Sequence, residues 1–183
     1  ASWSAPITIG AGVNADDISV ITALPALGKV GVLWSNQNTQ RFGFRTHTDG
    51  ATPTTWSTDE VPASQSALNV GTGMADDHLN IKVASDGTLY AAVKTSYDTP
   101  GYPKIALLVR RPAGVWDGLY EVDQVGTRGI VLLNEMRGDL TVCYTLSEGQ
   151  NDIVYKKTNL SAISFGARQT LIGGTTFNEP SSS

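Results

Sequence analysis

Short stretches in which apolar and polar residues alternate recur along the chain, and they predict β-strands. Leu79, Ile81 and Val83 alternate with polar residues, which is the period of two of a half-buried strand. Gly, Pro, Asn and Asp, the residues of tight turns, separate such stretches. The pattern predicts an all-β protein, with one helical turn at most, between Pro62 and Met74.

The predicted strands recur in a unit that appears three times, over residues 16–62, 76–124 and 128–173. The first strands begin near Ile18, Leu79 and Ile130. The other strands are predicted at 30–34, 42–44 and 56–58, then at 89–93, 105–109 and 116–118, and finally at 140–144, 153–155 and 165–167. Each unit is therefore expected to form a four-stranded antiparallel sheet whose last strand opens with an aromatic residue.

A repeat of four antiparallel strands is typical of a β-propeller blade. The sequence predicts a single β-propeller segment over residues 1–183, made of three such blades and an extra outer strand at 3–9. Natural propellers have about four to eight blades. The chain is therefore expected to be a partial propeller, an excerpt of a longer one, and its open blade faces are expected to cause self-association.

Charge and composition argue against several classes of partner. Thirteen Lys and Arg against 17 Asp and Glu give a formal net charge of −4 without a basic stripe, so we expect no nucleic-acid partner. No apolar stretch reaches 18 residues, so no membrane span is expected. Cys143, the single cysteine, lies in a predicted strand as a small buried side chain. Motifs for zinc or nucleotides are absent, and we expect no cofactor.

The loop that ends at Trp56 carries a family resemblance. From Thr46 it reads Thr-His-Thr-Asp-Gly-Ala-Thr-Pro-Thr-Thr-Trp, which resembles the Asp-box of sialidase-like propellers, Ser-x-Asp-x-Gly-x-Thr-Trp. Asp49 and Gly50 are adjacent here, and the loop is longer than in the motif. The second unit keeps Gly114 and an aromatic residue, whereas the third keeps only the aromatic residue.

In that family the Asp-box stabilises a turn and lies away from the ligand. The resemblance therefore implies structural roles for Asp49, Trp56, Trp116 and Phe165. It also implies a secreted or cell-surface location and a function related to glycans.

The loops at one rim of the predicted propeller carry the candidate ligand-binding residues. An Asp-Asp pair precedes the first strand of two units, at 16–17 and at 76–77. These carboxylates could bind a sugar or a calcium ion or transfer a proton, although the commoner role of Asp at such places is to cap a turn. No loop has the oxygen spacing of a dedicated calcium site, so no metal ligand is assigned. The candidates are Asp17, Asp77, His78, Arg128, Asn36, Tyr97 and Tyr102.

No complete catalytic set can be assembled from the sequence. Sialidase chemistry needs several arginines together with an acid and a Tyr-Glu pair. Arg45, Arg110 and Arg111 are expected at the ends of third strands, on the opposite rim, so only Arg128 is left. Our first hypothesis is a non-catalytic binding or scaffold propeller that recognises carbohydrate. The alternatives are a fragment of a sialidase-like glycoside hydrolase or polysaccharide lyase, and a propeller fragment that only assembles.

Overall fold

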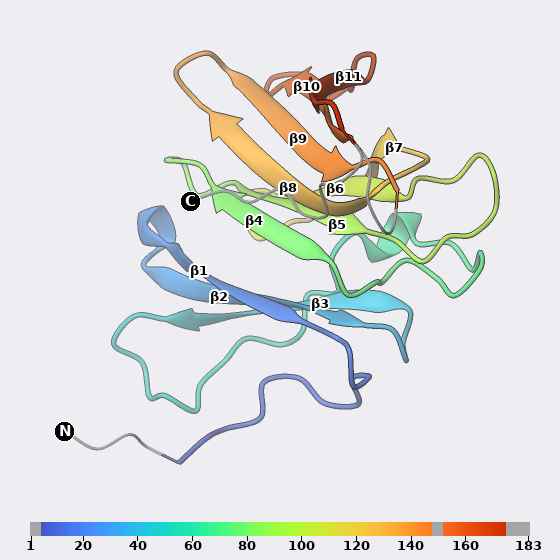
Figure 1. Cartoon of the computed structure of the whole chain (residues 1–183). Coiled ribbons are helices and arrows are strands. Elements are labelled where there is room, and N and C mark those ends of the chain that lie inside the picture. The colour runs from blue at the N-terminus through green and yellow to red at the C-terminus, as the bar shows by residue number, and fades with distance from the viewer. Residues whose placement is uncertain (1–4, 148–151, 175–183) are drawn as a thin grey trace.

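The computed structural model describes residues 5–147 and 152–174. These residues form eleven strands in three antiparallel sheets, with two short 3₁₀ turns, Pro25–Leu27 and Ser64–Ser66 (Figure 1). The first sheet contains β1 (Ser19–Leu24), β2 (Lys29–Asn36) and β3 (Arg41–Thr48). The second contains β4 (Leu79–Val83), β5 (Leu89–Lys94), β6 (Ile105–Arg110) and β7 (Tyr120–Asp123). The third contains β8 (Thr127–Asn134), β9 (Asp139–Thr145), β10 (Ile153–Asn159) and β11 (Gln169–Ile172). The prediction of an all-β chain is confirmed.

The first strands of the three sheets lie next to one another. Within each sheet the strands follow chain order, and β4 contacts both β1 and β8. In Figure 1 these three strands run in the same direction. β4 and β8 are linked through a side chain, because the backbone N–H of Val131 donates to Oδ1 of Asn80 at 3.1 Å. The sheets therefore stay separate while their first strands share one region of the molecule.

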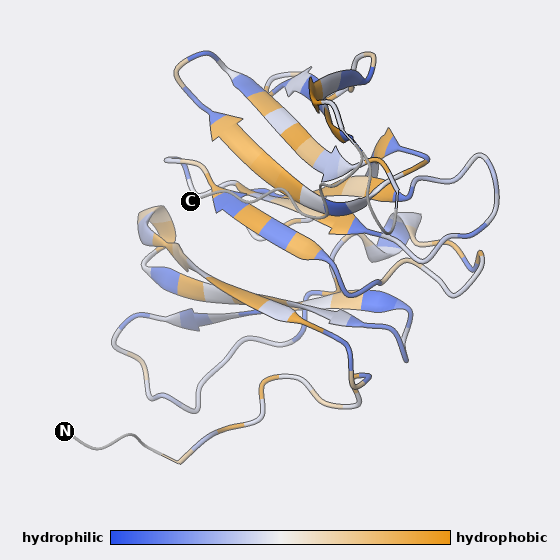
Figure 2. Cartoon of the chain, in the orientation of Figure 1, coloured by the Kyte–Doolittle hydropathy of each residue, from blue (hydrophilic) through white to orange (hydrophobic). Residues whose placement is uncertain are grey.

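Two apolar clusters separate the three sheets. Phe44 and Leu108 belong to the cluster between the first and second sheets, and Leu107 and Val131 to the cluster between the second and third. All six residues of β6 are buried, because successive side chains point to opposite faces and both faces are covered. This explains the apolar run from Ile105 to Val109 in β6, whereas β4 has the alternating pattern that Figure 2 shows as bands.

The fourth strand predicted at 56–58 does not form. The backbone N–H groups of Ser57 and Glu60 donate to the carbonyls of Thr46 and Phe44, both at 2.9 Å. The N–H groups of β3 on this edge donate to side-chain oxygens rather than to backbone carbonyls. Oγ of Ser57 accepts from the N–H of Thr46 at 2.9 Å, and Oδ1 of Asp59 accepts from the N–H of Phe44 at 3.0 Å. The first sheet therefore has three strands and an extended segment attached to its outer edge.

The outer strands of the other two sheets form, but later than predicted. β7 begins at Tyr120 and β11 at Gln169, each four residues after the aromatic residue that was expected to open it (120 − 116 and 169 − 165). The residue after each aromatic nevertheless donates its N–H to the neighbouring third strand. These bonds run from Ser57 to Thr46 at 2.9 Å, from Asp117 to Val109 at 2.9 Å and from Gly166 to Lys157 at 3.1 Å. The three sheets therefore have the same backbone arrangement as far as this hydrogen bond to the third strand.

The expected structural residues have different environments. Trp116 is 7% exposed and packs edge-on against Phe44, with ring centroids 5.3 Å apart. Phe165 is half-buried against the second apolar cluster. Trp56 is half-buried, and its Nε1 donates to the Pro53 carbonyl at 3.1 Å. Asp49 is exposed in its turn, where its backbone N–H donates to the carbonyl of Gly28 at 2.9 Å.

Three further expectations meet the structure here. The described part of the predicted strand at 3–9, residues 5–9, forms no strand and lies beside the first sheet. Arg45 lies inside β3 rather than at its end, because β3 continues to Thr48, whereas Arg110 does end β6. Within the described ranges, no helix has the length and hydropathy needed to cross a bilayer.

Candidate functional site

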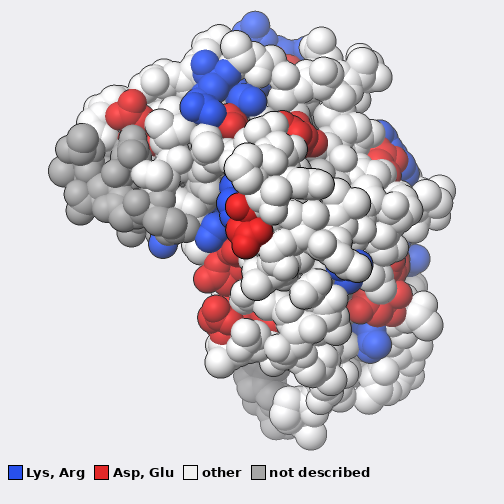
Figure 3. All heavy atoms as spheres, turned by 90° about the vertical axis from the view of Figure 1, so that its right-hand side faces the viewer, with Lys and Arg blue, Asp and Glu red and all other residues white. Residues whose placement is uncertain are grey.

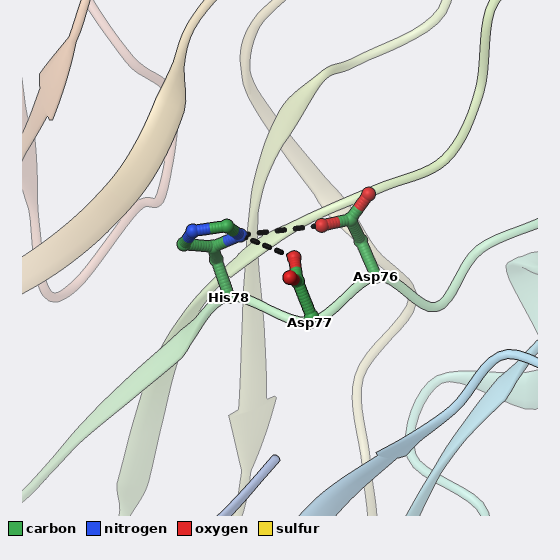
Figure 4. Close-up of side chains that lie close together, drawn as sticks. All are labelled: Asp76, Asp77 and His78. Atoms are coloured by element: carbon green, nitrogen blue, oxygen red, sulfur yellow. Dashed lines mark hydrogen bonds and ion pairs between the residues drawn. The ribbon is translucent and has the colours of Figure 1, made fainter. Parts of the chain in front are cut away.

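Three consecutive side chains, Asp76, Asp77 and His78, converge just before β4 (Figure 4). Nδ1 of His78 contacts Oδ1 of Asp77 and lies 3.4 Å from Oδ1 of Asp76. Lys94, at the end of β5, and Ser96, in the loop after it, complete the cluster. Nζ of Lys94 lies 3.4 Å from Oδ1 of Asp76, and the hydroxyl of Ser96 donates to Oδ2 of Asp76 at 2.9 Å. The sequence therefore brings two carboxylates, an imidazole and an ammonium group together.

The cluster changes the protonation of its members. Burial alone would raise the pKa of Asp76, but hydrogen bonds from His78 and Ser96 and the charge of Lys94 outweigh it and hold that pKa well below its usual range. Burial and the hydrogen bond with Asp76 raise the pKa of Asp77. The hydrogen bond to Asp76 raises the pKa of His78. An ionised Asp76 therefore favours a proton on His78.

A cavity of about 180 Å³ lies beside this cluster, where β1, β4 and β8 begin. We call it the polar pocket. Its wall includes Ile18, His78, Leu79, Asn80, Arg128 and Ile130. Ile18 and His78 occupy corresponding positions in their sheets. The carbonyl of Ile18 accepts the N–H of Ser35, near the end of β2, at 3.0 Å. The carbonyl of His78 accepts the N–H of Lys94, at the end of β5, at 2.9 Å. In Figure 4 the second ring nitrogen of His78 points away from both carboxylates.

Arg128 enters the polar pocket from a strained part of β8. Its φ of 55° lies in the left-handed region, where a side chain other than that of Gly costs about 1–2 kcal/mol. The pairing of β8 with β9 shifts register between Thr127 and Ile130, which is a β-bulge, and bulges redirect side chains next to functional sites. Strained residues of this kind cluster at binding and active sites.

Asp17 acts as a turn cap. Its Oδ2 accepts the N–H of Asn14 at 2.6 Å, and both of its carboxylate oxygens accept the N–H of Gln37 at 3.2 Å. Asp16 accepts from Nε2 of Gln37 at 3.0 Å. Because Asp76 binds Ser96 in the corresponding loop of the second sheet, both Asp-Asp pairs tie the loop after the second strand. Only the second pair adds a histidine at the polar pocket.

The remaining candidates do not line the polar pocket. Asn36 is 7% exposed, and its Oδ1 accepts the N–H of Thr39 at 3.0 Å, which closes the loop after β2. Tyr97 is 1% exposed, and its hydroxyl accepts the N–H of Leu68 at 3.0 Å. Tyr102 packs against it, with ring centroids 5.9 Å apart. The sequence did not reveal that the tyrosines pack inside the loops, because an aromatic residue in a polar loop is expected to be exposed.

Sequence reasoning overlooked three polar residues that the structure adds, which are Asn80, Lys94 and Ser96. Asn80 gave no signal, because it stands at an expected polar position of the alternating pattern in β4. Nothing in the local sequence marks Lys94 or Ser96 as part of the cluster. The antiparallel pairing of β4 with β5 is what brings Lys94 next to His78.

A second group of ionisable residues surrounds Asp123, the last residue of β7. Arg168 donates two hydrogen bonds to its carboxylate, both at 2.8 Å, and the hydroxyl of Tyr144 donates a third at 2.5 Å. Nζ of Lys156 lies 3.3 Å away. Burial would raise the pKa of Asp123, but these partners outweigh it and hold it well below the usual range. The group joins β7 to the third sheet.

Figure 3 shows the side of the molecule at which β1, β4 and β8 begin, and acidic and basic side chains stand close together on it. Comparison of the sequence with protein-family models and with curated proteins gives no match. The function is therefore argued from the geometry of the polar pocket.

Proposed function

We propose that the chain is a ligand-binding segment of a β-propeller and that the polar pocket binds a small polar ligand, such as a sugar unit of a glycan. One observation carries this proposal. Ile18, His78 and Arg128 come from the beginnings of the first strands of three sheets, and they line a single cavity. Blades arranged round an axis would bring such positions together at one rim. The resemblance of the loop before Trp56 to the Asp-box supports the same reading and a secreted or cell-surface setting.

The chemistry of the polar pocket suits a ligand rich in oxygen. Arg128 offers several N–H donors in a plane, and a protonated His78 offers one more. The volume of about 180 Å³ equals roughly six water molecules at about 30 Å³ each, which fits a single sugar ring. Hydrogen bonds from charged donors contribute about 1.5–3 kcal/mol each. We therefore expect binding that depends on both side chains.

A glycan array followed by calorimetric titration tests the proposal. The informative variant is Arg128→Gly, because Gly accepts a φ of 55° and the variant removes the guanidinium without straining β8. We expect it to weaken binding tenfold or more. His78→Asn should also weaken binding. Arg137→Ala serves as the control, since that side chain is 74% exposed and outside the pocket. Full affinity in Arg128→Gly would contradict the proposal.

A second candidate function is catalysis by a glycoside hydrolase or polysaccharide lyase, whose other residues would lie outside this chain. It is favoured by the pairing of Asp76 with Nδ1 of His78, which leaves the second ring nitrogen free to act as a general base. Slow cleavage of an array ligand, lost in His78→Asn and in Asp77→Asn, would support catalysis. Saturable binding without cleavage would support the binding function.

The third reading is a propeller fragment whose only property is assembly through its open blade faces. It predicts no ligand on the array and a mass that rises with concentration in light scattering. A monomer at all concentrations would argue against it.

A further inference from the structure

A second cavity, of about 270 Å³, lies between residues 5–13 and the first sheet. We call it the apolar cavity. Its apolar wall consists of Ile7, Ile9, Val13, Ile18, Val32 and Trp34. The Trp34 ring forms a fixed surface, because Gly43 and Gly10 hold it so closely that a Cβ at Gly43 would overlap the ring and one at Gly10 would lie 3.1 Å from it. The cavity is therefore a mainly apolar space between two segments of the chain, with the Trp34 ring as a closely held wall.

Two of the three polar side chains that line the apolar cavity, those of Asp17 and Ser35, already have partners. The carboxylate of Asp17 accepts backbone N–H groups from Asn14 and Gln37, at 2.6 and 3.2 Å. The hydroxyl of Ser35 accepts the N–H of Ile18 at 3.0 Å. An occupant therefore gains little from hydrogen bonds with this wall, whereas an apolar occupant gains from leaving water.

The mouth of the apolar cavity exposes hydrophobic surface. Ile7, Val13 and Ile18 are 41%, 45% and 42% exposed, although each also lines the cavity. Apolar groups that gather at an opening in this way mark ligand-binding surfaces. A volume of about 270 Å³ equals roughly nine water molecules, which is enough for an aromatic ring.

The apolar cavity and the polar pocket share Ile18 as a common wall. We infer that they are two subsites for one amphiphilic ligand, a glycoside whose sugar occupies the polar pocket and whose aryl or short alkyl substituent occupies the apolar cavity. The inference rests on the proposed function. Joining two weakly bound parts makes binding of the second part intramolecular, so the joined ligand binds more tightly than either part alone.

The test compares matched methyl and phenyl glycosides of glucose, galactose and glucuronic acid by calorimetric titration. We expect at least one phenyl glycoside to bind about tenfold or more tightly than its methyl counterpart, because the ring leaves water in the apolar cavity. Ile7→Ser and Val13→Ser should remove this preference without changing the affinity for the methyl glycoside. Arg128→Gly should weaken both glycosides. Leu171→Ser is the control, since Leu171 is 55% exposed in β11 and lines neither cavity.

Three outcomes would overturn the inference. Equal affinities of the methyl and phenyl glycosides would show that the apolar cavity is not a subsite, without contradicting the proposed function. Absence of binding by every glycoside would contradict both the apolar subsite and the proposed sugar binding. If Ile7→Ser dissociates a dimer in sedimentation velocity while the phenyl preference is absent, the apolar cavity is an interface between two copies of the chain.

Discussion

His78 belongs both to the charged cluster before β4 and to the wall of the polar pocket. Its Nδ1 faces two carboxylates, and its opposite nitrogen is turned away from them, beside the polar pocket. Arg128, on the other side of the pocket, has a left-handed φ of 55°. In the first sheet an apolar residue, Ile18, fills the place that corresponds to His78.

The pKa of His78 predicts how stability changes with pH. It is raised from 6.5, so the interaction with Asp76 is fully present below about pH 6.5 and is lost as the pH rises through the raised value. The raised pKa of Asp77 acts in the same direction, and the lowered pKa of Asp76 causes a loss only at acid pH, below about 3.8. We expect urea unfolding to show a smaller free energy at pH 8.5 than at pH 5.5, and His78→Asn to reduce this difference. His47→Asn is the control, and an unchanged difference in His78→Asn would contradict the prediction.

At the scale of the element, the outer edge of the first sheet shows what a sequence pattern can and cannot reveal. Trp56, Trp116 and Phe165 were predicted to open fourth strands, but two of these strands begin four residues later and the first does not form. The residue after each aromatic nevertheless donates its N–H to the third strand. The spacing did not reveal that Ser57 and Asp59 use side-chain oxygens in place of carbonyls. Such a substitution leaves no trace in hydrophobic periodicity, so the three-stranded sheet was read as four-stranded.

Asp59→Ala is expected to destabilise the protein by about 1–3 kcal/mol, because it leaves the buried N–H of Phe44 without its acceptor. The same oxygen also accepts the N–H of Val61 at 2.9 Å. Asp59→Asn keeps an oxygen at this place and should retain most of the stability. Chemical denaturation measures both variants, and equal losses in the two would show that the charge of Asp59, rather than its hydrogen bonds, matters.

The ion pair between Glu60 and Arg110 joins the first sheet to the second. Oε1 and Oε2 of Glu60 accept from Arg110 at 2.8 and 2.7 Å, and Nε1 of Trp116 donates to Oε2 at 2.8 Å. Glu60→Ala leaves the Arg110 side chain, 4% exposed, without its counter-charge, so we expect a loss of about 3–5 kcal/mol. Replacing Glu60 and Arg110 together by Leu and Met should cost less than Glu60→Ala alone. Thermal unfolding that ranks the variants in the opposite order would contradict this.

At the scale of the whole molecule, the sequence repeat predicted three units, and the described residues form three antiparallel sheets in which β4 contacts β1 and β8. The candidate site was predicted in part. His78 and Arg128 share a pocket, whereas Asn36, at the end of β2, and Tyr97, in the loop after β5, are buried and close those loops. The difference has a physical cause. Residues before a first strand are positioned by the repeat itself, but the conformation of a long loop depends on contacts that periodicity does not encode.

Leu107 and Leu108 test the division into two apolar clusters. Both are fully buried neighbours in β6, and they face different clusters. Each Leu→Ala variant should lose about 2–5 kcal/mol. Hydrogen exchange should separate them, with faster exchange of β1–β3 amides in Leu108→Ala and of β8–β10 amides in Leu107→Ala. Identical exchange maps would indicate one continuous core.

The hydrogen bond from Val131 to the side chain of Asn80 has a consequence for solubility. Strands at the margin of a sheet carry backbone groups that can recruit a foreign chain and start fibre growth. A carboxamide from the neighbouring sheet occupies one such group of β8, so an incoming peptide would first have to displace it. A single asparagine side chain thus makes this place on the margin of β8 less available to a foreign strand.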